Sequence, residues 1–180
     1  MNPSELLDHL AGLGLSTETH THEAVFTVEE SAPVKAAIAG AHSKNLFLKD
    51  RRGRLFLVVA EHDTRVDLKT LHERVGASGR LSFGSADLLR EVLGVEPGSV
   101  TPFALVHDRD RRVSVVLDEL LMRHPLLNFH PLANTMTTSI ANPDFLAFLK
   151  ATGYEPAVIR LGPQSERAKP DCMASGAAPS

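Results

Sequence analysis

The chain has 180 residues, of which 43% are hydrophobic and 23% are charged, and its formal net charge is −3. These values are typical of a globular domain that buries a core, and the negative charge does not favour a protein that coats nucleic acid. No apolar run approaches the roughly 20 residues of a membrane span, and Glu5 and Asp8 near Met1 argue against a signal peptide. A single cysteine, Cys172, excludes an internal disulfide and favours a reducing, cytoplasmic location.

The first half of the chain predicts two helices followed by a β-hairpin. Residues 3–13 place leucines on one helical stripe, and residues 16–22 favour a short edge strand or an extended segment. Thr27 and Glu30 have the spacing of a capping box, which predicts a helix that ends near Gly40.

Residues 43–50 and 55–60 are strand-like, and the short glycine-containing loop between them indicates a hairpin. The second strand is apolar on both faces and is therefore expected at the centre of the sheet. On the first strand, Lys44 shares a face with two leucines, while Asn45 shares the opposite face with Phe47. A lysine that opens an apolar strand face either extends to solvent at a sheet edge or lines a pocket, and this stretch alone leaves both interpretations open.

The second half predicts three more helices and four extended segments. The helices are expected over 68–75 after Asp67, over 86–93 after Ser85, and from Asn142-Pro143 to a stop at Gly153. The extended segments are expected over 113–117, 126–130, 135–140 and 157–161.

This mixture of hairpins and helices favours an α+β fold with a mixed sheet. Residues 1–161 are expected to form a single domain. Residues 162–180 are rich in Pro, Ser, Ala and Gly without periodicity, which predicts a disordered tail.

Residues 96–99 place proline and glycine at the positions of a type II turn. The same glycine opens the G-x-x-x-P pattern Gly98-Ser99-Val100-Thr101-Pro102. A turn alone explains the glycine. A loop whose backbone approaches a ligand could also hold a carbonyl oxygen or an oxyanion with its N–H groups.

Residues 128–139 are unusually polar for a segment bracketed by apolar runs. Pro131 keeps His130 in an extended geometry, and two asparagines and several hydroxyls lie nearby. This segment is either a polar core strand whose hydroxyls satisfy one another or one wall of a small polar pocket.

Nine histidines invite a metal hypothesis, but no cysteine pair and no H-E-x-x-H spacing accompanies them. The G-x-S-x-G elbow of serine hydrolases and the glycine-rich phosphate loops are also missing from the sequence. The sequence therefore favours neither a metal nor a conventional nucleophile.

Three motifs, in this order, resemble one known family. They are Lys44-Asn45-Leu46-Phe47-Leu48-Lys49-Asp50, the pattern from Gly98 to Pro102, and Phe129-His130-Pro131-Leu132 with Asn134 and Thr137. From about residue 4 to residue 161, the chain resembles the freestanding relatives of the editing domain inserted in bacterial prolyl-tRNA synthetases, the YbaK-like aminoacyl-tRNA deacylases. It looks most like the subgroup that removes alanine from mischarged tRNA(Pro) in trans.

The resemblance implies an α+β fold of the α/β/α type, with a mostly antiparallel mixed sheet flanked by helices. It also implies a hydrolase that needs no metal or cofactor, acts on mischarged tRNA and could meet prolyl-tRNA synthetase transiently. It implies catalytic roles for Lys44, which faces the site, for Gly98, whose loop holds the ester carbonyl, and for His130, which shapes the aminoacyl pocket. The family is thought to lack a protein nucleophile or general base, with hydroxyls of the terminal adenosine helping to position water. The implied substrate-binding residues are Thr27, Asn45, Ser99, Thr101, Pro102 and Asn134.

Three alternatives stay open: the same chemistry on another small aminoacyl group such as cysteine or serine, a non-catalytic nucleic-acid-binding module, and a metal hydrolase. The leading hypothesis makes a geometric prediction. Lys44, the Gly98 loop and His130 should line one cleft, although more than 80 residues separate the first from the last.

Overall fold

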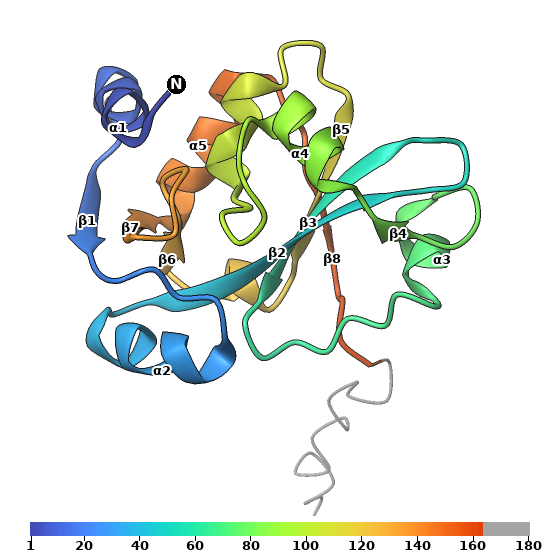
Figure 1. The fold of residues 1–180 in the computed structure, drawn as a ribbon, viewed down its shortest axis with the longest axis horizontal. Helices are drawn as coiled ribbons and strands as arrows, with labels where there is room; N and C mark the ends of the chain where they lie inside the picture. The colour runs from blue at the N-terminus through green and yellow to red at the C-terminus, as the bar shows by residue number, and fades with distance from the viewer. Residues whose placement is uncertain (164–180) are drawn as a thin grey trace, which may run out of the picture.

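An eight-stranded mixed sheet runs through the structure, a computed structural model that describes residues 1–163 (Figure 1). The strand order is β1-β7-β6-β2-β3-β5-β8, with β4 paired to β2 outside this path. The strands are β1 (Thr17–Thr21), β2 (Ala41–Lys49), β3 (Leu55–Glu61), β4 (Ser82–Phe83), β5 (Val113–Asp118), β6 (Leu126–Phe129), β7 (Met136–Ala141) and β8 (Ala157–Ile159). Four of the seven strand pairs are antiparallel, while β2–β6, β3–β5 and β5–β8 are parallel.

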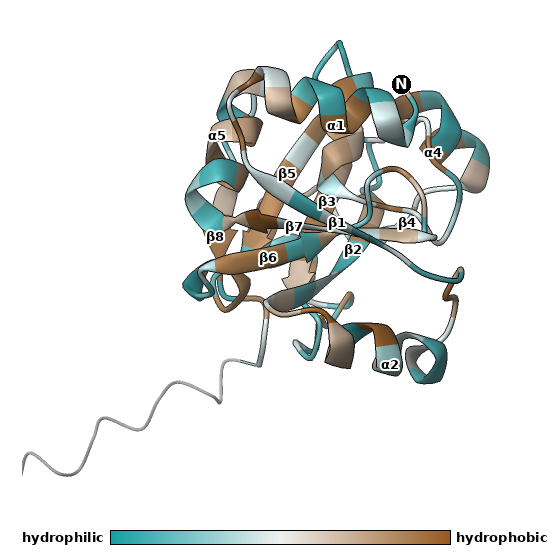
Figure 2. Cartoon of the chain, turned by 90° about the vertical axis from the view of Figure 1, so that its left-hand side faces the viewer, coloured by the Kyte–Doolittle hydropathy of each residue, from teal (hydrophilic) through white to brown (hydrophobic). Residues whose placement is uncertain are grey.

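Helices lie on both sides of this sheet, with α1, α4 and α5 on one side and α2 on the other (Figure 2). The helices are α1 (Pro3–Gly12), α2 (Val28–Ala37), α3 (Leu71–Val75), α4 (Ala86–Leu93) and α5 (Asn142–Thr152), with the 3-10 helices η1 (Pro102–His107) and η2 (Leu121–Arg123). The α+β prediction, with a mixed sheet flanked by helices, is confirmed. Within residues 1–163, none of the helices has the length and apolar character needed to cross a bilayer.

Most predicted helix ends are confirmed by their caps. Thr27 accepts a hydrogen bond from the Glu30 N–H at 3.1 Å, and Glu30 accepts in return from the Thr27 N–H at 3.2 Å, which completes the capping box of α2. Ser85 caps α4 in the same way by accepting from Leu88 at 3.1 Å.

The predicted start of α3 is wrong by three residues. The Asp67 carboxylate accepts from the Lys69 N–H at 3.0 Å, and the Asp67 carbonyl accepts from both Thr70 and Leu71. Residues 68–70 are therefore held in turns, so that the helix begins only at Leu71.

The central strand β3 divides the core into two clusters. Its residues 55–60 are all buried, as their two-sided apolar pattern predicts. Leu57 and Val59 pack with α1, α4 and α5, whereas Phe56 and Val58 pack on the other face with Leu71 of α3. The side chains of β2 alternate between the same two clusters.

The predicted tail, including Cys172, lies outside the described residues, apart from Gly162 and Pro163.

Candidate functional site

A cavity of about 60 Å³ lies where α2 faces β2 and the β6–β7 hairpin. Most of its lining is polar, and we call it the His130 cavity. It is lined by Val25, Ser31, Val34, Lys35, His42, Ser43, Asn45, Asn128, Phe129, His130 and Thr137. Three segments that are far apart in the sequence therefore meet at one small polar space.

Asn45 lines this cavity and carries a buried, unpartnered acceptor atom. Its Nδ2 donates to the Val100 carbonyl at 3.1 Å, which ties β2 to the loop after Gly98. Its Oδ1 is buried and, among the residues that the structure describes, has no hydrogen-bond partner. A buried oxygen without a donor is unfavourable by about 1–3 kcal/mol, so this atom is well placed to accept from a ligand.

His130 is oriented by the backbone of the next strand. Its Nδ1 donates to the Met136 carbonyl at 2.8 Å, which leaves Nε2 as the lone-pair acceptor of the neutral ring. Burial lowers the pKa of His130, and the nearby side chains of His22, His42 and Lys35 lower it further, against the opposing hydrogen bond to Met136. The ring is therefore neutral near pH 7 and can accept a hydrogen bond from water or an amine.

The turn that follows His130 is conformationally strained. Leu132 has φ +69°, in the left-handed region that residues with a branched side chain avoid at about 1–2 kcal/mol. Pro131 is buried beside it. Strain of this kind is often retained where it shapes a binding site.

The polar run 128–139 serves both purposes that its sequence left open. Within the sheet, Ser139 donates to Asn128 Oδ1, and the Thr19 and Thr138 hydroxyls lie 2.8 Å apart. Asn128, His130 and Thr137 from the same run also line the cavity. The internal hydrogen bonds thus fix a polar wall.

The Gly98 loop is joined to this site by the hydrogen bond from Asn45 to Val100. Gly98 has φ +92°, and the Ser99 N–H donates to the Glu96 carbonyl at 3.0 Å, which confirms the predicted turn. Because that N–H is used within the turn, Val100 and Thr101 carry the backbone donors that could face an oxyanion. A Cβ added at Gly98 would lie 3.6 Å from the ring of Phe26 and 3.8 Å from Asn134 Nδ2.

The other predicted binding residues are placed less directly. Thr27 caps α2, and the buried Thr101 hydroxyl accepts from the Phe103 N–H at 3.3 Å at the start of η1. Ser99 and Pro102 are buried in the same loop. Thr27, Ser99, Thr101 and Pro102 are not among the residues that line the His130 cavity, and they belong to the helix and the loop beside it.

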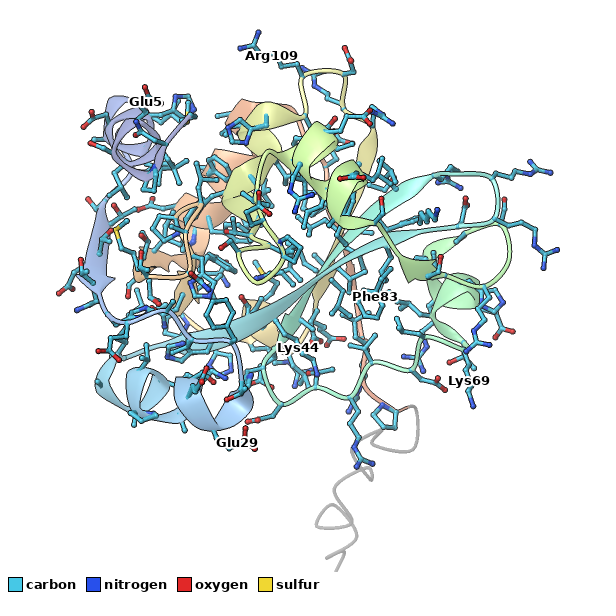
Figure 3. The ribbon with its side chains drawn as sticks, viewed as in Figure 1. Glu5, Glu29, Lys44, Lys69, Phe83 and Arg109 are labelled. Carbon is cyan, nitrogen blue, oxygen red and sulfur yellow. The ribbon has the colours of Figure 1, made fainter. Side chains whose placement is uncertain are left out.

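Lys44 does not share that cavity, so the prediction of one cleft is wrong for this residue. Lys44, which is labelled in Figure 3, lines a separate, open groove of about 940 Å³ that we call the Lys44 groove. Its lining residues are Lys44, Arg65, Val66, Asp67, Thr70, Glu73, Arg74, Leu161, Gly162 and Pro163. Alternation along β2 does not by itself explain this separation, because His42 lies on the same strand face as Lys44 and yet lines the His130 cavity.

Sequence reasoning missed Lys35 and His42, which also line the His130 cavity. Lys35 lies on a helix whose sequence looks solvent-exposed, and a lysine at such a position does not indicate a functional site.

Among the described residues, no group of three or more His, Cys, Asp or Glu side chains is arranged to hold a metal ion.

Comparison with known proteins agrees with this geometry. Residues 22–148 match the aminoacyl-tRNA editing domain family. The chain is 39% identical over 162 residues to the mouse prolyl-tRNA synthetase associated domain-containing protein 1, covering 88% of this chain and 95% of the mouse protein. It is 37% identical over 141 residues to the prolyl-tRNA editing protein ProX of Acetoanaerobium sticklandii, covering 78% and 85%.

The fold is similar to that of a solved candidate trans-editing enzyme for prolyl-tRNA synthetase, with a TM-score of 0.66, 22% identity, and coverage of 90% of this chain and 99% of the other. The matched region contains α2, β2 and the β6–β7 hairpin, which are the elements that build the His130 cavity. The chain therefore belongs to the aminoacyl-tRNA editing domain family, among the relatives of the domain associated with prolyl-tRNA synthetase.

Proposed function

We propose that this protein hydrolyses the ester of mischarged Ala-tRNA(Pro) and so releases alanine from the tRNA 3′ end. The observation that carries the proposal is the His130 cavity, a small polar space with an unpartnered acceptor at Asn45. The name of the ProX relative, a prolyl-tRNA editing protein, supports the choice of tRNA.

The size of the cavity supports a small amino acid. A cavity of about 60 Å³ holds a few water-sized groups, since one water needs roughly 10–15 Å³ of such space. In this proposal the space suits a small side chain, such as that of alanine, serine or cysteine, better than the ring of proline. A small pocket of this kind complements a synthetase site that cannot reject a smaller amino acid.

The charges of the site suit an aminoacyl ester. In our proposal, the substrate amino group donates to Asn45 Oδ1 and to the neutral His130 Nε2, while the ester carbonyl faces the backbone N–H groups of the Gly98 loop. Water attacks the carbonyl carbon, the bond from that carbon to the ribose oxygen breaks, and the ribose oxygen takes up the proton. Because the ester is already activated, orientation and oxyanion stabilisation can supply the acceleration.

Lys44 takes a different role in this proposal. Its open groove contains Arg65 and Arg74 beside the carboxylates Asp67 and Glu73, and we assign its ammonium to a phosphate of the terminal nucleotides rather than to the reacting carbon. Transient contact with prolyl-tRNA synthetase and hydrolysis without a metal remain parts of the proposal.

The decisive experiment measures deacylation of Ala-tRNA(Pro), with Pro-tRNA(Pro) and an alanine-charged non-proline tRNA as controls. We expect release of alanine from the first substrate and little release of proline. Faster release of serine or cysteine from tRNA(Pro) would change the assigned amino acid. Salt-sensitive tRNA binding without loss of any aminoacyl group would instead identify a binding module, and activity lost on chelation and restored by a metal ion would identify a metal hydrolase.

A further inference from the structure

Lys35 brings a positive charge into the His130 cavity. It lies in the last turn of α2 and is the lysine among the residues that line the cavity. The histidines that share the lining, His42 and His130, both have a pKa lowered mainly by burial, so they are neutral near pH 7. Lys35 is therefore the residue of this lining that carries a positive charge near pH 7.

His62 holds this ammonium in place. Lys35 Nζ lies 2.7 Å from His62 Nε2 and 3.0 Å from His62 Nδ1, so the ammonium is in direct contact with the imidazole near both ring nitrogens. His62 follows β3 directly, and its N–H donates to the His42 carbonyl at 2.9 Å.

Buried Asp118 then anchors the turn that carries His62. The Asp118 carboxylate accepts from the Glu61 N–H at 2.9 Å and from the Thr64 hydroxyl at 2.6 Å. The partner of Lys35 is thus fixed to the central sheet and does not depend on a flexible surface loop.

An aminoacyl ester carries a positively charged amino group and electronegative oxygens, which are attracted to different side chains of such a cavity. Its amino group is attracted to the unpartnered Asn45 Oδ1 and is repelled by Lys35, whereas its oxygens are attracted to the lysine. We propose that Lys35 is a substrate-binding residue whose ammonium, positioned by His62, binds an oxygen of the acylated 3′ end. That oxygen belongs either to the ester carbonyl or to the terminal phosphate, and this inference rests on the proposed function.

The surrounding charges keep His62 in its accepting form. Burial, the charge of Lys35 and, more weakly, the charge of Lys44 lower the pKa of His62, while the carboxylates of Asp63 and Glu61 oppose them. Burial also lowers the pKa of Lys35, against the charge of Asp63. Once His62 is protonated at acidic pH, it can no longer accept from Lys35, and the two cations repel each other.

The first test compares Lys35→Met, Lys35→Arg and the control Lys69→Met. Met keeps the apolar stem and removes the charge, and Lys69 is an exposed lysine well away from Lys44 (Figure 3). Loss of a charged hydrogen bond predicts that Lys35→Met lowers kcat/KM on Ala-tRNA(Pro) about 10- to 100-fold. Lys35→Arg should recover part of the rate, and Lys69→Met should match the wild type.

The same variants on 3′-alanyl-adenosine, which has no phosphate, identify the oxygen. A loss in kcat that persists on this ester assigns Lys35 to the carbonyl, and a loss in KM confined to tRNA assigns it to the phosphate. Full activity of a folded Lys35→Met variant on both substrates would overturn the inference while leaving the proposed function intact. Conversely, a wild-type protein that releases no amino acid from either substrate would refute the proposed function itself.

A second measurement does not depend on activity. In a histidine NMR titration, Lys35→Met should raise the His62 midpoint because the nearby cation is removed, and Lys69→Met should leave it unchanged. His62→Gln should lower kcat/KM, as Lys35→Met should. An unshifted His62 midpoint in Lys35→Met would refute the pairing of the two residues, whether or not the protein proves to be a deacylase.

Discussion

The two hollows beside β2, the His130 cavity and the Lys44 groove, differ in size, exposure and charge. The His130 cavity is about 60 Å³ and is lined by Asn45, which has an unpartnered buried acceptor, whereas the Lys44 groove is about 940 Å³, open, and lined by the cations Lys44, Arg65 and Arg74 and the carboxylates Asp67 and Glu73. The small cavity can select an aminoacyl group by shape and hydrogen bonding. The open groove can contribute mainly electrostatic attraction, which solvent and salt weaken.

This difference shows why neighbouring residues of one motif need not share one role. Lys44 and Asn45 are adjacent in the chain, yet each faces a different hollow. His62 lies near residues of both hollows, because Lys44 contributes to its lowered pKa and Lys35 contacts its ring directly. Variants in each of the two hollows can therefore separate selection of the amino acid from binding of the tRNA.

The largest effect is expected for Asn45→Ala. The change removes the unpartnered acceptor and leaves the Val100 carbonyl without its donor, so kcat/KM should fall about 100-fold. Single-turnover deacylation of Ala-tRNA(Pro) measures this loss. Asn45→Asp keeps the acceptor oxygens and should retain more activity, and a fully active Asn45→Ala protein would remove the small cavity from the mechanism.

Gly98→Ala should lower activity about 10-fold, because displacement of the loop misplaces its backbone donors. The added Cβ meets Phe26 and Asn134 only at ordinary contact distances, so the main penalty is the positive φ of +92°, about 1 kcal/mol of unfolding free energy.

Gly53→Ala is the matched control for that variant. Gly53 has φ +80° in the β2–β3 turn, with nothing within 4 Å of an added Cβ. Denaturant unfolding should show a similar loss of stability for both variants, and deacylation should fall for Gly98→Ala alone. Equal activities would argue against a role for the loop.

Lys44→Ala should raise KM for tRNA about fivefold, with little change in kcat, as expected for an exposed phosphate contact. The effect should shrink at high salt and disappear on 3′-alanyl-adenosine. A collapse of kcat on that small ester would mean instead that Lys44 reaches the reacting atoms, which would contradict the division between the two hollows.

The smallest effect is a dependence of stability on pH. His42, His62 and His130 all have a pKa below the ordinary value of 6.5, so below that pH the unfolded chain binds more protons than the folded protein. Stability should be complete above pH 6.5 and should decline as the pH falls through the lowered values. Urea unfolding at several pH values tests this, and His130→Gln should flatten the decline. A pH-independent midpoint in the wild type would contradict the burial of these rings.

Local patterns predicted much of the fold. The capping box at Thr27, the Ser85 cap and the β2–β3 hairpin were all predicted correctly, because each depends on residues a few positions apart. The start of α3 was missed because the Asp67 side chain bonds its own turn rather than a helix end, and sequence does not distinguish these two uses of an N-cap residue.

The candidate site was only partly predictable. Asn45, His130 and the Gly98 loop were found through motifs, and the structure brings them together through the Asn45–Val100 hydrogen bond and the lining of the cavity. Lys35 was missed because its proximity to His62 depends on how α2 packs beside the loop after β3. No pattern within a helix reports such a contact.

The sequence by itself determined the alternation of β2, the helix caps and the turn at Gly98, since these follow from short-range backbone geometry and hydrogen bonding. Only the tertiary structure decided that Asn45 and His130 share a cavity while Lys44 faces a separate groove. The physical reason is that strand pairing and helix packing join residues far apart in the chain, whereas alternation along one strand does not determine which cavity a side chain lines.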